Sequence, residues 1–123
     1  YSMAATQFNA HSFESVGVDV TNASADAFTP DSNEIYIVKG LRFTNYSAGS
    51  VTVHAQFYPG GDTTSYWVLK DHTLTAGSSY DVLSNAPVTI SGVAGDRLKV
   101  YASSNSVAHA VITMMGLGRQ TGL

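Results

Sequence analysis

The chain contains no cysteine and little charge of either sign. Without cysteine it can form neither disulfides nor thiolate-ligated metal sites, so packing and subunit contacts must stabilise it. Only six of its 123 residues are Lys or Arg, and they form no basic run, which argues against a direct nucleic-acid partner. No apolar run approaches the roughly 20 residues of a membrane-spanning helix, and no signal-peptide pattern is present. We therefore expect no membrane partner.

Charged residues make up 12% of the chain, about half of the ~25% that is usual in globular domains. Ser, Thr and Gly take their place. An ordinary β domain rich in turns would have this composition. So would a domain whose surface is covered by neighbours, because the cores of protein interfaces are depleted in charge. We favour the second interpretation, in a single domain, which suits a chain of this length.

The clearest pattern lies between residues 35 and 57. From 51 to 57 apolar and polar residues alternate, which predicts a strand with one buried face. The run from 35 to 43 is similar, except that Lys39 falls among its apolar positions, so we expect a β-bulge at Lys39 and Gly40. Between the runs, residues 45–50 predict a turn in which Asn45 bonds its own backbone. Together they predict a hairpin that begins the fold.

Shorter strand patterns recur along the chain with turn signals every ~8–12 residues. They lie at 16–20, 66–69, 80–83, 88–90, 97–102 and 107–115. Residues 21–28 could form a short helix. The pattern predicts an all-β fold of about eight short strands, an antiparallel β-sandwich of the jelly-roll or immunoglobulin-like kind, with a closed barrel as the nearest alternative. We expect the sandwich at 16–116, an N-terminal arm or edge strand at 1–15, and a C-terminal tail at 117–123.

Three turn-and-strand motifs resemble those of a known class of proteins. They are Gly40-Leu41-Arg42-Phe43-Thr44-Asn45, Leu74-Thr75-Ala76-Gly77 and Ala94-Gly95-Asp96-Arg97-Leu98. Over residues 35–116 the chain resembles small β-sandwich structural proteins of tailed bacteriophages. The motifs are turns and apolar positions, with no catalytic signature among them.

The resemblance implies a non-enzymatic virion component, assembled in the host cytoplasm. It implies above all a capsid decoration (cement) protein that binds and stabilises the shell, and otherwise a neck or tail accessory protein. Its partners would be the major capsid protein or other virion proteins. It would itself be a homo-oligomer, with a trimer favoured. The N-terminal segment, which the resemblance does not cover, would be the docking arm.

Candidate contact residues are apolar or aromatic side chains near the ends of the chain and around its longest loop. Aromatic side chains anchor many protein interfaces, and at a loop rim they also stack on sugar rings. A glycan-binding adhesion module, with Tyr58, Tyr66 and Trp67 as its platform, is therefore an alternative. The residues expected at a protein interface are Phe8, Phe13, Tyr58, Tyr66, Trp67, Leu117, Arg119 and Leu123.

No catalytic, cofactor-binding or metal site is expected. The four His have no helical metal-ligand spacing, and the carboxylates lie mostly in turns. His54 alternates with the apolar residues of its strand, so we expect it in solvent or at a subunit contact. His109 shares the register of valines on its strand, which places it in the core or an interface. Of Met114 and Met115, one should fill the core and the other face a neighbour.

Overall fold

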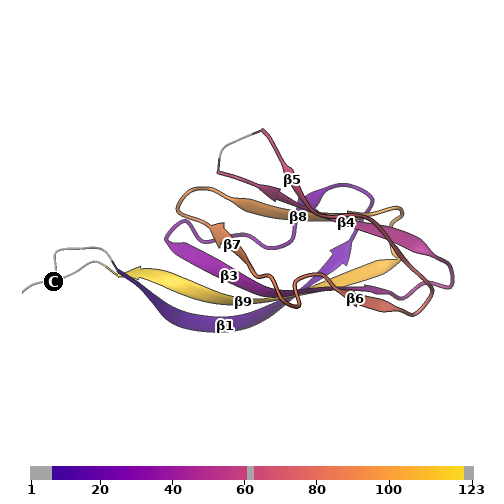
Figure 1. The fold of residues 1–123 in the computed structure, drawn as a ribbon, viewed down its shortest axis with the longest axis horizontal. Coiled ribbons are helices and arrows are strands. Elements are labelled where there is room, and N and C mark those ends of the chain that lie inside the picture. Colours follow the sequence, from indigo (N-terminus) through magenta and orange to yellow (C-terminus); the bar gives the residue numbers. More distant parts are fainter. Residues whose placement is uncertain (1–6, 61–62, 121–123) are drawn as a thin grey trace, which may run out of the picture.

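The computed structural model describes residues 7–60 and 63–120, with side chains for 13–60 and 63–118. This part of the chain contains strands and turns but no helix, and so no helix that could cross a membrane. The described residues form nine strands, and Figure 1 shows the strands in two stacked layers. They are β1 (Gln7–Val20), β2 (Ala25–Asp26), β3 (Glu34–Asn45), β4 (Val51–Tyr58), β5 (Tyr66–Leu74), β6 (Ser79–Asp81), β7 (Val88–Ser91), β8 (Arg97–Ala102) and β9 (Ala108–Gln120).

The two layers are antiparallel sheets. Sheet A has the order β1-β9-β3-β6, with β7 also paired to β3, and sheet B has the order β2-β8-β4-β5. β1 to β4 alternate between sheet A and sheet B, and β5 then pairs with β4 within sheet B. In each sheet a late strand, β9 or β8, lies between two early ones. This strand order is that of a jelly roll, and it decides between the two sandwich types expected from the sequence.

The core lies between the sheets and follows the pleat of the strands. In β9 every second residue from Ala108 to Met114 is buried, and the residues between them are more exposed. The same alternation holds in β8 and in the second half of β3. Met114 fills the core, as expected of one residue of the methionine pair, and Met115 lies on the outer face of sheet A.

The predicted hairpin of residues 35–57 is present as β3, a turn and β4, but these two strands lie in different sheets. The interpretation as a two-stranded hairpin was therefore wrong, because a jelly roll pairs each of these strands with late strands instead. The bulge predicted at Lys39 and Gly40 is confirmed, since the register between β3 and β9 shifts between Val38 and Gly40. The predicted turn is also confirmed: Asn45 binds the backbone of Ser47 and Gly49.

One edge of sheet A is built from two pieces. β6 pairs with residues 42–44 of β3 and β7 pairs with Ile35 to Val38. Between β6 and β7 the chain leaves the edge, Leu83 is buried in the core, and Pro87 precedes β7. Because proline cannot donate a ladder hydrogen bond, it suits such an interruption.

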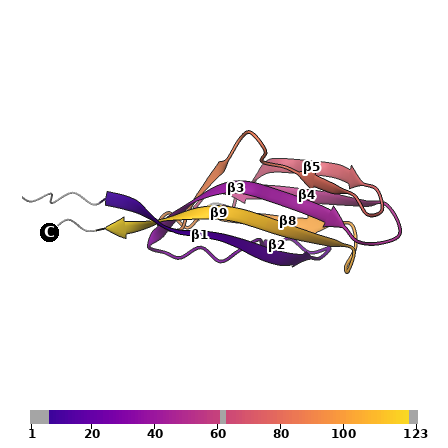
Figure 2. The same cartoon turned by 90° about the horizontal axis from the view of Figure 1, so that it is seen from below.

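β1 and β9 are longer than the sequence patterns indicated. β1 begins at Gln7 and β9 continues to Gln120, and the two pair along their length and run out together beyond the rest of the sandwich (Figure 2). The boundaries that we expected at 15/16 and 116/117 fall inside these strands. The helix considered for residues 21–28 is absent, and that segment contains β2.

Candidate functional site: the outer faces of the two sheets

The outer face of sheet A carries a row of apolar side chains in the middle of a three-strand pairing. Phe13 of β1 pairs with Met115 of β9, which pairs with Ile37 of β3. Residues paired across neighbouring strands project from the same face, so the three side chains form one row. Phe13 is 77% exposed, an unusual position for a large apolar side chain.

The next pair along the strands extends this row. Leu117 pairs with Ile35, and both side chains are half-buried on the same face. We call the five residues Phe13, Ile35, Ile37, Met115 and Leu117 the apolar patch. A contiguous apolar surface on a soluble domain marks an interaction site more often than scattered apolar residues do.

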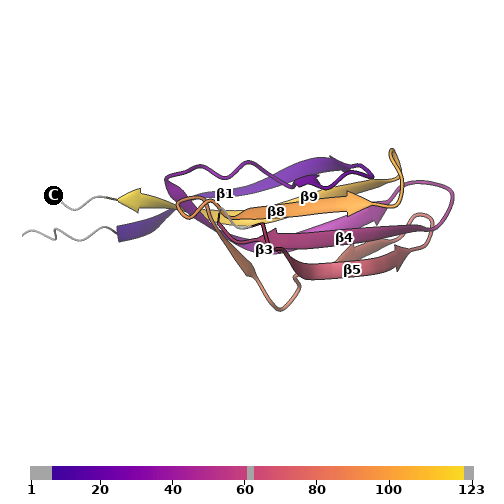
Figure 3. The ribbon, with the colours of Figure 1, turned by 90° about the horizontal axis from the view of Figure 1, so that it is seen from above.

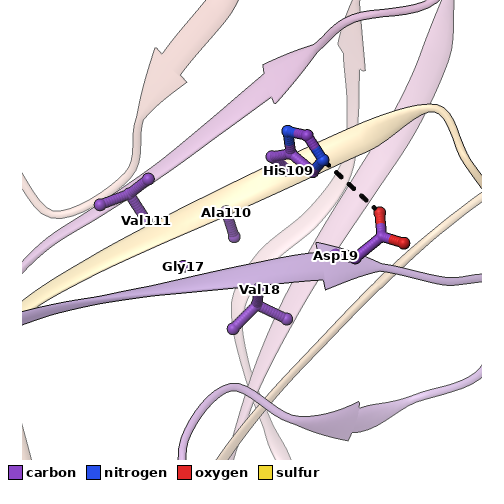
Figure 4. A pocket seen from close by; sticks show the side chains of 6 residues that line it. All are labelled: Gly17, Val18, Asp19, His109, Ala110 and Val111. Carbon is purple, nitrogen blue, oxygen red and sulfur yellow. Dashed lines mark ion pairs between the residues drawn. The ribbon is translucent and has the colours of Figure 1, made fainter.

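A hollow of about 350 Å³ lies beside the patch on β1 and β9. Gly17 forms its floor opposite Val111, and the Asp19 carboxylate stands 3.8 Å from Nε2 of His109 at one end (Figure 4). The ring of Tyr46 packs on His109, with centroids 4.3 Å apart. Partial desolvation and the neighbouring Asp19 carboxylate, which accepts the hydroxyl hydrogen, raise the pKa of Tyr46 above its ordinary value.

A second hollow, of about 190 Å³, lies on the other side of Val111. Gly40 of β3 and Thr113 of β9 pair across it, and Arg42 and Asp81 line its outer rim. Glycines on both sides of β9 therefore recess the centre of this face. The apolar patch stands at one end of the recess and the Tyr46–His109 pair at the other.

The outer face of sheet B has a different character, because it centres on a buried histidine. His54 of β4 is only 7% exposed. The ring of Tyr101 from β8 stacks on it at 4.2 Å with an interplanar angle of 9°, and Trp67 of β5 lies 6.0 Å away. The backbone N–H of Asp71 donates to Nδ1 of His54 at 3.1 Å.

This arrangement corrects the expectation for His54. The side chain does leave the sheet on the face opposite the core, as the alternation predicted. However, it is not in solvent, because Tyr101 and the strand segment at Asp71 cover it. Asp71 has φ = 52°, in the left-handed region, and the register between β4 and β5 shifts beside it. Irregular backbone of this kind is concentrated at functional sites. Here it directs the Asp71 N–H toward Nδ1 of His54.

The expectation for His109 was also wrong in part. It does share the register of Val111, but that register faces outward, and the His109 side chain is 58% exposed. The wrong inference came from the valines: Val111 is itself 38% exposed, so its register is not that of the core.

The aromatic residues predicted around the long loop separate onto different sides. Trp67 pairs with Gln56, and Tyr58 lies two positions further along β4, on the same outer face of sheet B. Tyr66 precedes Trp67 on β5 and so leaves the strand on the other side. Lys70 Nζ lies 5.3 Å from the centre of the Trp67 ring, and Lys99 Nζ lies 5.4 Å from that of Tyr58. The cations therefore stand over the two rings that would have to receive a sugar.

The remaining predicted contact residues lie at the shared end of β1 and β9. Phe13 and Leu117 belong to the apolar patch. Phe8 and Arg119 are backbone partners in the β1–β9 ladder, and their side chains lie outside the described part. Leu123 lies outside the described residues altogether. Sequence reasoning missed Ile35 and Ile37, and it expected one residue of the pair Met114 and Met115 to face a neighbour without deciding which. Their common face appears only when β9 is placed between β1 and β3.

No group of three or more His, Cys, Asp or Glu side chains in residues 7–60 and 63–120 is arranged to hold a metal ion. On the surface, Lys99 Nζ lies 3.0 Å and Arg97 Nε 3.7 Å from Asp26 carboxylate oxygens. Exposed pairs of this kind contribute little to stability. The outer faces of sheets A and B therefore provide contact area and aromatic rings.

Comparison with known proteins shows the fold and no family. No family model matches the chain, and no curated protein is similar to it in sequence. One similar solved structure comes from work on Bacillus endospore appendages, described as a novel family of disulfide-linked pili. It has a TM-score of 0.52 and 17% identity, over 94% of this chain and 92% of that one.

Two other similar structures are viral. A chain of infectious bursal disease virus, Gx strain, matches with a TM-score of 0.49 and 14% identity over 95% of this chain. A VP2 subviral particle of the same virus matches with a TM-score of 0.47 and 15% identity over 98%. The chain spans about a third of these viral chains, 32% and 33%. At such identities the pilus protein confirms the β-sandwich alone.

Proposed function

We propose that this chain is a non-enzymatic structural protein that binds other subunits of an assembly through the outer face of sheet A. The observation that carries the proposal is the row of Phe13, Met115 and Ile37, an apolar surface that no described part of the chain covers. Burial of such a row on a partner is favourable by about 25 cal/mol per Å² of apolar area. The scarcity of charge in the chain supports the same conclusion.

The more specific role that we propose is a capsid decoration protein of a bacteriophage virion, which adds cohesion between shell subunits. A neck or tail accessory protein would use the same face. Jelly rolls serve widely in coats, where a rigid sandwich presents a fixed surface. The pilus protein of the same fold is described as disulfide-linked. With no cysteine, this chain must associate by non-covalent burial.

Co-sedimentation with shells of the major capsid protein from the same virion tests this role. The chain should pellet with the shells, and the variant Ile37→Ser/Met115→Ser should lose at least tenfold in affinity, because two apolar side chains leave the contact. Val93→Ser is the control, since Val93 is a 41% exposed apolar residue outside the patch, in the turn between β7 and β8. Equal binding by all three proteins would refute docking through this face.

A second candidate, glycan binding on sheet B, has one specific observation in its favour. Trp67 is 45% exposed on the same face as Tyr58, and it is the only tryptophan of the chain. Its fluorescence therefore reports that face alone. A shift in emission on titration with oligosaccharides, absent in Trp67→Phe, would support an adhesion module, and an unchanged spectrum across a glycan panel would exclude it.

A further inference from the structure

β1 is a long sheet edge without the usual protection against strand pairing. It is the outermost strand of sheet A and pairs only with β9 in the described part of the chain. Its 14 residues include no Lys, Arg or Pro. Natural proteins protect exposed edges with charged side chains, Lys above all, or with Pro, bulges or short strands, and β1 has only the two acidic residues Glu14 and Asp19. The one irregularity in β1 lies between Ala10 and Ser12, so the edge from Ser12 to Val20 is regular.

The other edges of the two sheets have such protection. β2 has two residues, and β6 and β7 have three and four, with Pro87 between them. β5 carries Lys70 and the left-handed Asp71, and its ladder with β4 shifts register. Of the edges described, β1 alone is long, has no Lys, Arg or Pro, and is regular from Ser12 to Val20. Figures 2 and 3 show it as the outermost strand of its sheet.

Gly17, in the middle of this edge, has no role within the chain itself. Its φ is not positive, so its backbone conformation does not require glycine. A Cβ added there would meet nothing within 4 Å. Glycine in a strand weakens it, because it gains no packing and loses more backbone entropy than other residues. Glycine at this position is therefore unfavourable for the strand, but its missing side chain leaves the hollow between Val111 and the Asp19–His109 pair open.

Phe13 is the counterpart of that hollow on the same strand. It lies two same-face positions from Gly17, with Ser15 between them. An aromatic ring placed across from a strand glycine covers the exposed backbone and recovers the missing packing. Within the chain this cannot happen, because both residues belong to β1. A second copy of β1 can bring them together.

We propose that two copies of this chain pair through β1, antiparallel about a two-fold axis at Ser15. Two residues that face each other across this interface then have numbers that sum to 30. Phe13 of each copy lies over Gly17 of the other and enters the hollow of about 350 Å³. The interface is isologous, as in most soluble dimers. Sheet A becomes continuous across the pair.

Charge and the covering of Gly17 together select this register over its neighbours. Antiparallel pairing about a two-fold axis keeps same-face residues opposite one another only when the axis passes through a residue, so the allowed registers are centred on successive residues. Centring on Val16 would set Phe13 opposite Asp19 and leave Gly17 uncovered. Centring on Glu14 would set two carboxylates against each other, and centring on Phe13 would stack two rings and leave Gly17 uncovered. Centring on Ser15 sets Glu14 opposite Val16, and no like charges between Ser12 and Val18 face each other.

The groups that face the hollow are compatible with the ring. Val111 gives it an apolar wall, and the imidazole of His109 and the phenol of Tyr46 stand beyond Asp19 at its far end. This inference rests on the proposed function in one respect: the dimer joins the apolar patches of two copies on one continuous face, which would then dock as a unit. Its own tests measure the dimer without any shell.

The mass of the full chain over a concentration series gives the first test, and we expect a dimer. Gly17→Val should remain monomeric at concentrations where the natural chain is paired, at least tenfold weaker in association. Its monomer should be as stable as the natural chain or more so, because valine favours strands and meets open space. Phe13→Ser should also weaken the dimer at least tenfold, and Val93→Ser should not.

A single cysteine tests the register. Ser15→Cys places two thiols on the proposed axis, and since the chain has no other cysteine, oxidation should give a disulfide-linked dimer. Ser103→Cys, exposed on the turn after β8, is the control and should react far more slowly. The inference is overturned by a natural chain that stays monomeric, by a Gly17→Val dimer of unchanged affinity, or by equal cross-linking of the two cysteines. A dimer that fails to bind shells would refute the proposed function alone.

Discussion

The backbone N–H of Asp71 donates a hydrogen bond to Nδ1 of His54, at 3.1 Å, across the β4–β5 ladder. The acceptor in this hydrogen bond is the lone pair of Nδ1. The Asp71 carboxylate lies 3.4 Å from the same nitrogen. The left-handed backbone at Asp71 and the stacked ring of Tyr101 enclose the imidazole. His54 thus organises the outer face of sheet B as a packed residue.

Replacing His54 should destabilise the fold although it lies on an outer face. His54→Ala leaves the Asp71 N–H without its acceptor and removes the ring under Tyr101, so we expect a loss of about 2 kcal/mol in the free energy of unfolding. His54→Asn should lose less, because its amide oxygen can accept the same hydrogen. Denaturant unfolding measures both. His72→Ala, which removes a half-buried ring stacked on exposed Tyr80, should cost less than His54→Ala.

Asn45 should be the polar residue to which the fold is most sensitive. It is fully buried, and its Nδ2 donates to the carbonyl oxygens of Gly49 at 2.7 Å and Leu74 at 3.0 Å. Its Oδ1 accepts the Ser47 N–H at 2.9 Å. Asn45→Ala removes a hydrogen-bond donor from each of the two carbonyls and the acceptor of the Ser47 N–H, which we expect to cost about 2–4 kcal/mol.

The aspartate variant separates the donor from the acceptor at this position. Asn45→Asp keeps the acceptor for Ser47 but turns a carboxylate oxygen toward two carbonyl oxygens, so it should be less stable than Asn45→Ala at neutral pH. Asn85→Ala, at an exposed loop position, should change the midpoint of thermal unfolding little. An Asn45→Asp variant as stable as the natural chain would contradict this assignment of the amide.

Local patterns in the sequence predicted the features that depend on neighbouring residues. The alternation of β8 follows from Leu98, Val100 and Ala102, and the bulge near Gly40 from one lysine out of register. The turn after Asn45 also depends on a few adjacent residues. The all-β class follows from such signals, because each strand needs only its own side chains to show two faces.

Features that depend on strand pairing could not be predicted in this way. The burial of His54 requires Tyr101 from β8 and Asp71 from β5, and the apolar patch requires β9 between β1 and β3. No local signal gives the sheet order, which is why β3 and β4 were interpreted as one hairpin. The sequence pattern predicts residues 16–20 of β1 as a strand, but the part of β1 up to Ser15 is weak in pattern and allows an arm or an edge strand, because its pairing with β9 is not visible locally.

Alkaline unfolding should depend on Tyr36. Burial raises the pKa of Tyr36 above 10.0, partly offset by the Asp31 N–H that donates to its hydroxyl oxygen, and nearby Glu34 and Asp31 carboxylates raise it further. The unfolded chain therefore loses this proton first as pH rises. The stability that the buried phenol retains at neutral pH should fall as pH rises through about 10 toward the folded pKa.

Tyr36→Phe separates this titration from the hydrogen bond. The variant should be about 1 kcal/mol less stable at neutral pH, because the Asp31 N–H loses its acceptor. Its free energy of unfolding should then decline less steeply above pH ~10 than that of the natural chain. Tyr66→Phe, whose side chain is exposed, should keep the natural slope. Identical slopes for Tyr36→Phe and the natural chain would show that Tyr36 does not titrate differently on folding.

Gly92 should tolerate no side chain, for reasons of space and not of backbone conformation. Its φ is not positive, but an added Cβ would overlap the carbonyl oxygen of Asp31 and lie 2.9 Å from that of Glu34. Its N–H donates to the Glu34 oxygen at 2.8 Å, so the two segments cannot separate without breaking that bond. Gly92→Ala should therefore cost about 2–3 kcal/mol in the free energy of unfolding, measured by thermal or denaturant unfolding.

Gly49→Ala is the matched control, because a Cβ added at Gly49 meets nothing within 4 Å. This variant should be neutral or slightly stabilising, since alanine narrows the unfolded ensemble. If the two alanine variants unfold alike, the close approach of Asp31 to Gly92 is not a constraint on the fold.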